Sequence, residues 1–530
     1  MNGTSVKPAA GRGGRRAFLV GAAAAACAVS ASRVSAQTAA SVPAPGGGKW
    51  YRTASDLVGD LAARRVSSVE LLDQAIARIE GLDKHTNAVV VRDFDRARRA
   101  AVAADQALAR GERRPLLGLP MTVKESFNIA GLPTTWGIPA FKDWRPPEDS
   151  VVVERLKAAG AVIIGKTNAP VALADWQTTN PIYGTTNNPY DIDRTPGGSS
   201  GGAAAALAAG YVALEAGSDI GGSLRTPAHY CGVFAHKPTH GIVPLRGHTF
   251  PGLPALPSNG DGLAVVGPMA RTARDLALEL EVIAGPDEQR DGVGWRLVLP
   301  RSRHAALRDF RVLMIDTHPL GATAAAIRAA LENLADRLGK GGVTVARESP
   351  LLPDLGEATR NYIRLLGPVM TQGRPPAFYE QMRSIAASMG PDNQSLDAIY
   401  VRSANVGWRE WRAADAARAV LRRQWAALFK QWDVVLCPVM PTVAFKHDHA
   451  EVSARRVEVD GQTQPYINHI IWAGFATSAG LPATVAPIER SPGGLPIGVQ
   501  IVGPHLEDST PLMFAQLMER AFGGFVPPVF

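Results

Sequence analysis

The chain has 530 residues, of which 46% are hydrophobic and 20% are charged, and its formal net charge is +8 at pH 7. This composition is typical of a globular protein with a sizeable core, and it excludes a disordered chain. Residues 1–36 hold five basic residues and no acidic ones, so the remainder has a net charge of only +3. Because no basic tract with interleaved aromatic residues remains, the sequence does not indicate a nucleic-acid partner.

An export signal is predicted over residues 1–36. The adjacent Arg15 and Arg16 precede a weakly apolar Ala/Gly-rich run that ends in Val-Ser-Ala, a pattern that resembles a twin-arginine signal. We therefore expect a periplasmic or secreted protein, with cleavage after Ala36. The apolar run is shorter than the roughly 20 residues that a membrane span needs, so no stable membrane insertion is expected after cleavage. A lipoprotein with a lipidated Cys27 is the alternative.

Two cysteines lie beyond this leader, Cys231 and Cys437. They are too few for a disulfide framework or a zinc cluster, and we expect both to be small buried hydrophobic residues. The run His447-Asp448-His449 has metal-binding residue types, but a solvated loop or edge strand explains it better, because metal sites need more ligands. The sequence therefore predicts neither a metal nor a cofactor.

Helix and strand patterns alternate after a Pro/Gly-rich loop over 37–53. Ser67 and Glu70 match a capping box, which predicts a helix that ends at Gly81. The further elements expected in this half are a helix over about 94–110, a strand over 118–124, a helix over about 150–159 and a strand over 161–164. Such alternation is typical of an α/β sheet whose connections cross its faces.

The second half continues this pattern, with a mainly helical stretch over about 355–429. Strands are expected over 263–266, 311–316 and 433–438, a hairpin over 480–487 and 495–502, and a helix after it. Because there is neither an internal repeat nor a further linker, we predict one large domain over 54–530.

The segment 195–227 holds two glycine-flanked serines, Ser199 and Ser223, joined by an alanine-rich run. Glycine on both sides of a serine permits sharp turns and close approach of a substrate. Successive N–H groups of the turn before Ser223 can converge on one point, as an oxyanion hole requires. A flexible Gly/Ser linker is the alternative, but linkers have polar flanks, and the flanks here are apolar.

A serine nucleophile needs a group that takes its proton. Gly197 to Gly201 formally match the G-x-S-x-G elbow, which would make Ser199 the nucleophile and a later histidine the base. That elbow follows an apolar strand, whereas residues 187–196 are polar and rich in turn residues. Since there is no S-x-x-K motif either, a lysine distant in sequence remains as the base.

Several further motifs occur in a fixed order along the chain. They are GGSSGG at 197–202, SDIGGSLR at 218–225, CG at 231–232, KPT at 237–239, GLPA at 480–483 and LPIGVQ at 495–500. Together they resemble the amidase signature family of serine hydrolases, from Ala54 to the last residue. The resemblance implies a single α/β domain with a central mixed, largely parallel sheet and helices on both faces.

The resemblance also implies a catalytic triad of Ser223 as nucleophile, Ser199 as middle member held by a cis peptide bond, and Lys124 as base. Burial would lower the pKa of a lysine and let it accept a proton. Lys166 is the rival base, at a position that the family uses structurally. The expected oxyanion donors are the N–H groups of Ile220, Gly221, Gly222 and Ser223.

Four residues are expected to support this site: Ser200, Ser218, Asp219 and Arg225. An ion pair between Asp219 and Arg225 would fix the turn. The helical stretch 355–429 would cover the pocket. Its candidate wall residues are Tyr362, Trp408 and Trp411, for which core packing is the alternative role. Two departures from the family pattern, Glu125 after the lysine and residues 476–479, bear on specificity.

The sequence therefore predicts an amidase that hydrolyses a linear carboxylic amide to an acid and ammonia or an amine through an acyl-enzyme. A carboxylesterase on the same triad and a non-catalytic ligand-binding protein are the alternatives. The export leader argues against an amidotransferase subunit for tRNA charging, which works in the cytoplasm with partner subunits. A small-molecule amide is the expected partner, with a homodimer as a further expectation, and the sequence does not specify which amide.

Overall fold

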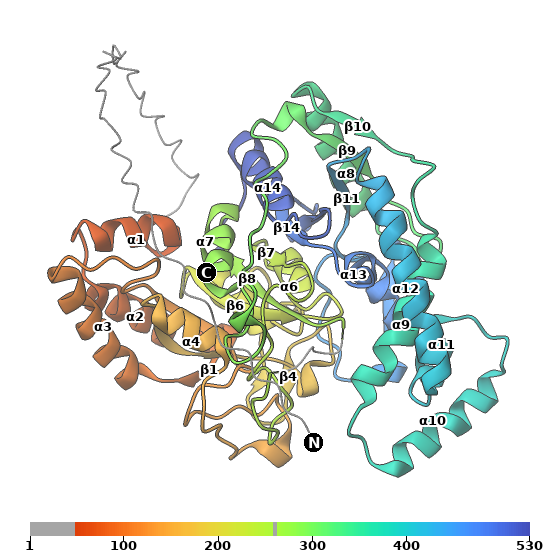
Figure 1. Ribbon diagram of the computed structural model, residues 1–530, viewed down its shortest axis with the longest axis horizontal. Helices are drawn as coiled ribbons and strands as arrows, with labels where there is room; N and C mark the ends of the chain where they lie inside the picture. Colours follow the sequence, from red (N-terminus) through yellow and green to blue (C-terminus); the bar gives the residue numbers. More distant parts are fainter. Residues whose placement is uncertain (1–47, 258–261) are drawn as a thin grey trace, which may run out of the picture. The chain divides into compact units, whose positions relative to one another are not determined.

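The computed structural model describes residues 48–257 and 262–530, and a sheet of 11 strands runs through them (Figure 1). In spatial order the strands are β1 (Val89–Arg92), β3 (Val162–Thr167), β2 (Pro120–Lys124), β6 (Leu214–Asp219), β8 (Val265–Ala270), β7 (Phe234–Lys237), β14 (Ala483–Arg490), β15 (Pro496–Val502), β11 (Val434–Pro438), β9 (Arg311–Met314) and β10 (Thr344–Ala346). Two small sheets pair β4 (Thr179–Asn180) with β5 (Gly184–Thr185) and β12 (Arg456–Val459) with β13 (Gln462–Pro465).

The predicted mixed sheet is confirmed, but it is not largely parallel, because only four of its ten neighbouring pairs are parallel, and these form two separate groups. β2 is parallel to both β3 and β6, and β9 is parallel to both β10 and β11. The other six neighbouring pairs are antiparallel, so the centre of the sheet is antiparallel. Parallel β2 and β6 bring their carboxyl ends to one edge of the sheet, which is where α/β proteins commonly place ligands.

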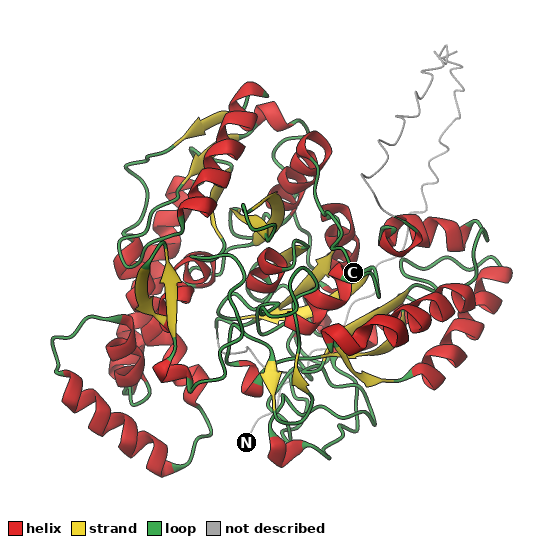
Figure 2. Cartoon of the chain, turned by 180° about the vertical axis from the view of Figure 1, so that it is seen from behind, coloured by secondary structure: helices red, strands yellow, loops and turns green. Residues whose placement is uncertain are grey.

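Helices cover both faces of the sheet, as Figure 2 shows. One apolar core lies between the sheet and α4, α7, α8 and α14, and a second lies between the sheet and α2, α5 and α6. The helices in this part of the chain are α1 (Ala54–Ala62), α2 (Ser68–Thr86), α3 (Phe94–Ala109), α4 (Val151–Ala158), α5 (Gly201–Ala208), α6 (Arg225–Tyr230), α7 (Ala273–Ile283), α8 (Ala325–Lys340) and α14 (Ser509–Phe522).

The stretch predicted to be mainly helical is helical. It contains α9 (Leu355–Thr371), α10 (Pro376–Met389), α11 (Leu396–Ser403) and α12 (Trp408–Leu428). Helix α9 packs on α11, α12 and α13 (Ile470–Thr477), and these helices enclose a third apolar core. Because α13 also approaches the turn after β6, this layer reaches the edge where β2 and β6 end.

The predicted end of the second helix is wrong. The capping box of Ser67 and Glu70 is present, but α2 continues past Gly81 to Thr86. Asn87 ends it with a left-handed conformation, φ +50°, and its N–H donates to the carbonyl of Asp83. Gly81 is exposed, and a glycine inside a helix costs only about 1 kcal/mol, which the buried residues of the following turn offset.

The described end of the expected linker, residues 48–53, contacts the domain. The hydroxyl of Tyr51 accepts a hydrogen bond from Arg78 at 3.1 Å, and the carbonyl of Arg52 accepts one from Arg271 at 2.7 Å. None of the described helices is long and apolar enough to cross a membrane. The predicted leader, 1–36, lies outside the described residues.

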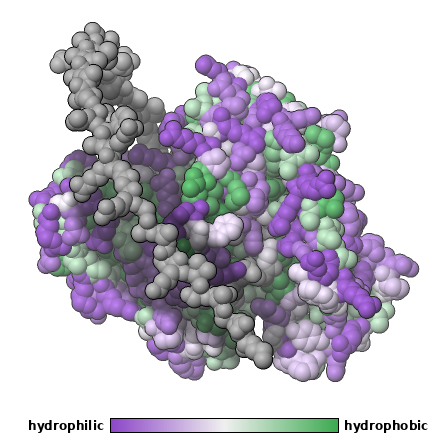
Figure 3. Space-filling view, viewed as in Figure 1, coloured by the Kyte–Doolittle hydropathy of each residue, from purple (hydrophilic) through white to green (hydrophobic). Residues whose placement is uncertain are grey.

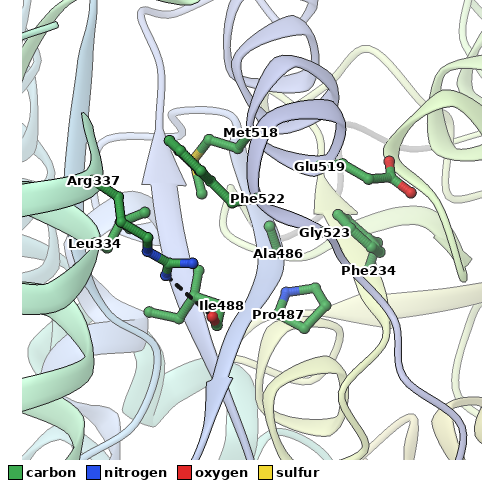
Figure 4. A pocket seen from close by; sticks show the side chains of 10 residues that line it. All are labelled: Phe234, Leu334, Arg337, Ala486, Pro487, Ile488, Met518, Glu519, Phe522 and Gly523. Carbon is green, nitrogen blue, oxygen red and sulfur yellow. Dashed lines mark hydrogen bonds between the residues drawn. The ribbon is translucent and has the colours of Figure 1, made fainter. Parts of the chain in front are cut away.

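Hydrophobic residues on the face in Figure 3 form separate patches among hydrophilic ones. A small hollow between α8, β14 and α14 is lined by apolar side chains such as Met518 and Phe522 (Figure 4). At its rim the guanidinium of Arg337 donates to the carbonyl of Ile488 at 3.2 Å and lies over the ring of Phe522. This hollow contains none of the predicted site residues, so it belongs to the packing of α8 on α14.

Candidate active site

Lys124 is the last residue of β2, at the edge where β2 and β6 end. Its side chain is fully buried. The Nζ atom lies 2.6 Å from Oγ of Ser199 and 3.0 Å from Oγ of Ser218. The structure therefore brings the predicted base and the predicted middle serine within hydrogen-bonding distance of each other.

Burial lowers the pKa of Lys124 from 10.5 to about 7, because the protein interior disfavours the charged ammonium form. The negative charges of Asp219, Glu215 and Glu125 raise this pKa, but their effect is smaller. A substantial fraction of the Lys124 side chains is therefore neutral near pH 7, and a neutral amine can act as a general base.

Ser199 lies in a glycine-rich segment that packs tightly against other backbone. The Gly198–Ser199 peptide bond is cis. A Cβ atom on Gly198 would overlap the carbonyl oxygen of Asp175, and one on Gly202 would overlap the backbone nitrogen of Asn168. Such close approach requires glycine, so the flexible-linker alternative is wrong for this segment.

Ser223 lies in the turn that joins β6 to α6. The N–H of Ser200 donates to the carbonyl of Ser223 at 3.0 Å, which ties the segment that carries Ser199 to this turn. Ser223 keeps 6% of its surface exposed, whereas Ser199 keeps 1% and Lys124 none. Of the three residues, the predicted nucleophile is thus the most accessible to a substrate and the predicted base the least.

The expected ion pair between Asp219 and Arg225 is confirmed, with both side chains buried and a shortest distance of 2.7 Å. Burial alone would raise the pKa of Asp219, but the charge and hydrogen bonds of Arg225 hold it at about 2. The Asp219 carboxylate also accepts the N–H groups of Gly222 and Leu224. One carboxylate therefore fixes the turn and caps the start of α6.

The structure reduces the expected oxyanion donors from four to three. The N–H of Gly222 donates to Oδ1 of Asp219 at 2.9 Å, so this group is already occupied. Across residues 48–257 and 262–530, the N–H groups of Ile220, Gly221 and Ser223 donate to no protein acceptor. These three remain as candidate donors to a substrate oxygen.

Ser200 and Ser218 support the site from behind. The hydroxyl of Ser200 donates to the carbonyl of Ser218 at 3.3 Å and accepts from its N–H at 3.4 Å. The hydroxyl of Ser218 lies next to Lys124 instead of the turn. Ser218 is therefore a second polar contact for the candidate base.

The sequence profile of the family described as Amidase matches residues 70–512, which is most of the chain. The chain belongs to the amidase signature family. A glutamyl-tRNA(Gln) amidotransferase subunit from Anaeromyxobacter sp. is 34% identical to it over 498 residues, 88% of this chain and 96% of that protein. Indoleacetamide hydrolase of Bradyrhizobium diazoefficiens is 32% identical over 494 residues, 90% and 88% of the two chains.

Solved structures agree with this assignment. A protein from the complex described as revealing the evolutionary origins of an s-triazine catabolic enzyme is 30% identical to this chain, with a TM-score of 0.74 and coverage of 88% and 98%. A bacterial aryl acylamidase of the amidase signature family, at 24% identity and a TM-score of 0.74, shares the fold over 89% and 96% of the chains. The family assignment and the predicted α/β fold are thus confirmed, and amide hydrolysis is the chemistry of the family.

Lys166 of this amidase signature chain has another set of contacts. It lies on β3, where its amine donates to the carbonyl of Pro133 and, at 2.8 Å, to the hydroxyl of Thr134. Burial lowers its pKa to about 8, and the nearby Glu125 raises it. Neither serine of the candidate triad is among these contacts, which favours Lys124 as the base.

The three candidate wall residues occupy different environments. Tyr362 is fully buried on α9, and its hydroxyl donates to the carbonyl of Ile220, so it contacts the turn before Ser223. Trp408 is 73% exposed and stacks on Trp411 with ring centroids 5.5 Å apart. The guanidinium of Arg412 lies over the Trp408 ring, so these contacts stay within α12, and the substrate role of the two tryptophans stays a prediction.

Sequence reasoning missed Trp176. This half-buried side chain lies in the loop between Leu173 and β4, and its Nε1 donates to the carbonyl of Gly221 at 2.8 Å. No motif marks it, because a tryptophan in a loop has no distinctive spacing.

His447 and His449 stack on each other, and the described residues contain no cluster of His, Cys, Asp and Glu suited to a metal ion.

Proposed function

We propose that this amidase signature protein cleaves a carboxylic amide through an acyl-enzyme on Ser223. The observation that supports it most strongly is the contact of 2.6 Å between Lys124 and Ser199, completely buried and tied to the Ser223 turn through Ser200. A lysine whose pKa is lowered to about 7, next to a serine, is the arrangement that an activated nucleophile needs.

In the proposed mechanism, neutral Lys124 takes the proton of Ser199 while Ser199 takes the proton of Ser223. The Oγ atom of Ser223 attacks the amide carbon, and the N–H groups of Ile220, Gly221 and Ser223 stabilise the resulting oxyanion; each such donor contributes roughly 3 kcal/mol to lowering the barrier. The proton returns through Ser199 to the leaving nitrogen, and the C–N bond breaks. Water then hydrolyses the ester by the same route, which releases the acid and restores Ser223.

The proposed substrate class is a small carboxylic amide. One relative is named for the hydrolysis of indoleacetamide, and another is named for amidotransferase chemistry, so amide chemistry is common to both. An ester would form the same acyl-enzyme, so carboxylesterase activity on the same triad is the second candidate. A non-catalytic binding protein is disfavoured because Lys124 contacts Ser199 and the neighbouring Ser200 is hydrogen-bonded to the backbone of Ser223.

We further propose that the protein is exported and loses residues 1–36. Arg15 and Arg16, followed by a weakly apolar run, support this proposal. Export would separate the chain from the cytoplasmic tRNA-charging machinery, so an independent hydrolase is favoured over an amidotransferase subunit. A homodimer is the proposed assembly, and size-exclusion chromatography with light scattering tests it.

Fluorophosphonate labelling with intact mass and peptide mapping tests the proposed function. We expect one adduct on Ser223 that is lost in both Ser223→Ala and Lys124→Ala. An adduct on Ser199 would indicate an elbow-type hydrolase, and no adduct would favour the binding protein. A panel of aliphatic, aryl, fatty and peptide amides, with the matching esters, then identifies the substrate class.

A further inference from the structure

Each backbone carbonyl of the turn from Ile220 to Ser223 accepts a hydrogen bond. Backbone N–H groups bind two of them: that of Thr226 binds the Gly222 carbonyl at 2.7 Å, and that of Ser200 binds the Ser223 carbonyl. The other two carbonyls, those of Ile220 and Gly221, depend on aromatic side chains from distant parts of the chain.

The two aromatic donors are Tyr362 and Trp176. The hydroxyl of Tyr362 donates to the carbonyl of Ile220, 142 positions earlier in the sequence. The indole Nε1 of Trp176 donates to the carbonyl of Gly221 at 2.8 Å. Because C=O and N–H point in opposite directions across a trans peptide, the bond to Ile220 fixes where the N–H of Gly221 points. The next peptide, between Gly221 and Gly222, is held at both groups: its carbonyl accepts from Trp176 and its N–H donates to Asp219. These two bonds limit the rotation of Gly221.

Close packing does not fix the direction of the peptide between Ile220 and Gly221. A Cβ atom on Gly221 would make only ordinary contacts, the nearest at 3.7 Å, and the next residue, Gly222, has φ of +100°. Rotation of the peptide between Ile220 and Gly221 would replace an N–H donor by a carbonyl oxygen. A carbonyl dipole facing the developing oxyanion would repel it, which is worse than the loss of one donor.

Both donors are themselves held in place. The ring of Tyr362 packs so closely on Gly474 of α13 that a Cβ there would lie 2.7 Å from the ring. On either side of Trp176, Asp175 binds Arg455 and the hydroxyl of Tyr466, and Gln177 exchanges two hydrogen bonds of 2.9 Å with the backbone of residue 448. Such anchored donors can preorganise a backbone at low cost during the reaction.

We propose that Tyr362 is a positioning residue that holds the Ile220 carbonyl and so aims the N–H of Gly221 at the oxyanion, and that Trp176 supports it by holding the next peptide, whose N–H is bound to Asp219, so that Gly221 cannot rotate. This inference rests on the proposed function, since it assigns a role in the same reaction. Neither residue touches the reacting atoms in this mechanism. Tyr362 acts through the peptide group that it binds, and Trp176 acts on the adjacent peptide by limiting rotation at Gly221.

Tyr362→Phe and Trp176→Phe test the proposal because each removes the donor and keeps an aromatic ring. We expect each variant to lower kcat about 10-fold to 100-fold, while KM changes less than about twofold. This loss is at or below the loss of about 100-fold to 1,000-fold that follows removal of an entire oxyanion donor. A trifluoromethyl ketone that matches the acyl group forms a tetrahedral adduct with an oxyanion. Its inhibition constant should rise by the same factor by which kcat falls.

Tyr379→Phe is the matched control. The hydroxyl of Tyr379 donates to the carbonyl of Thr371 at 2.6 Å, at the other end of α9. We expect its thermal midpoint to fall about as much as that of Tyr362→Phe, with unchanged kcat and unchanged inhibitor affinity. Equal kcat losses in both variants would indicate a general effect on the helices and overturn the proposal.

Wild-type kcat and inhibitor affinity in Tyr362→Phe and Trp176→Phe would also overturn it. The wild-type enzyme separates this failure from a failure of the proposed function. If fluorophosphonate labels Ser223 and an amide is hydrolysed, only the positioning roles are wrong. If the wild-type protein gives neither adduct nor hydrolysis, the proposed function fails and the positioning roles fail with it.

Discussion

The amine nitrogen of Lys124 lies 2.6 Å from the hydroxyl oxygen of Ser199, in the interior and across 75 positions of sequence. Parallel pairing of β2 with β6 brings Lys124 beside the strand that leads to Ser223, and α5 follows Ser199 on the same edge. The sheet order thus assembles the candidate triad from three segments.

Lys124→Met should abolish hydrolysis, with a loss in kcat of at least about 10³-fold, because no neutral amine remains to take the proton of Ser199. Methionine fills a similar volume, so the fold should persist. The measurement is kcat on the best amide of the panel, together with the rate of fluorophosphonate labelling. Residual activity within tenfold of the wild type would rule out Lys124 as the base.

The acid limb of the kcat/KM profile should have an apparent pKa of about 7, since only neutral Lys124 accepts a proton. Activity is then fully present above this pH and falls about tenfold per unit below it. The nearby His248 does not titrate there, because burial lowers its pKa to about 3. A limb near pH 4 would instead indicate a carboxylate base.

Glu215→Gln should move that limb to lower pH. Glu215 lies on β6, and its charge raises the pKa of Lys124, so an uncharged amide of the same shape removes this effect. Burial raises the pKa of Glu215 itself to about 8, so most Glu215 carboxyls are uncharged near pH 7 and the shift of the limb should be small.

Glu279→Gln is the control for this shift. Glu279 is a buried carboxyl on α7 whose pKa burial raises well above its usual value, and it is not among the groups that influence the pKa of Lys124. The limb should therefore keep its position in this variant. Equal movement of the limb in both variants would show that the shift does not come from the charge of Glu215 on Lys124.

Much of the fold could be predicted because local signals agree with it. The capping box of Ser67 begins α2, and the apolar runs at β2, β3 and β11 became buried strands. Gly81 misled the prediction, since tertiary burial overrides the weak helix propensity of one exposed glycine. The antiparallel centre of the sheet could not be foreseen, because strand patterns do not state which strands become neighbours.

The candidate site also contains residues that the sequence indicated and residues that it did not. The two serines and their glycines form one continuous segment, so the sequence indicated them together. Trp176 and Tyr362 approach that segment from a loop and from α9, where no motif marks them. The occupied N–H of Gly222 was also missed, because only the folded turn brings it to Asp219.

Lys166→Met should destabilise the fold without removing activity. It leaves the carbonyl of Pro133 and the hydroxyl of Thr134 without their buried donor, and it removes the positive charge that lowers the pKa of the buried Glu125. The expected loss in the free energy of unfolding is about 1–3 kcal/mol. Urea denaturation measures it, and adding Glu125→Gln should recover part of the loss. A loss of activity in a folded Lys166→Met variant would restore Lys166 as a candidate base.

Asp219→Asn should lower the free energy of unfolding by roughly 3–5 kcal/mol, since it removes the carboxylate partner of the buried Arg225. The pKa of Asp219 is 3.8 when unperturbed and about 2 in the fold, so its contribution to stability is present above pH 3.8 and is lost as the pH falls through about 2. The difference between variant and wild type should therefore be constant above pH 4 and shrink below it. A difference that persists unchanged at pH 2 would assign the loss to packing.

Two tryptophans of α12 provide the last prediction. Trp425 is 1% exposed, and Trp425→Ala should lower the free energy of unfolding by about 3–5 kcal/mol. Trp408 is 73% exposed, so Trp408→Ala should change it by less than about 0.5 kcal/mol and yield a folded enzyme. If Trp408 contacts substrate, as its place in the helical stretch suggests, the KM of the Trp408→Ala enzyme should rise while its kcat is unchanged. An unchanged KM would remove Trp408 from the substrate site and leave its stacking on Trp411 as a surface contact.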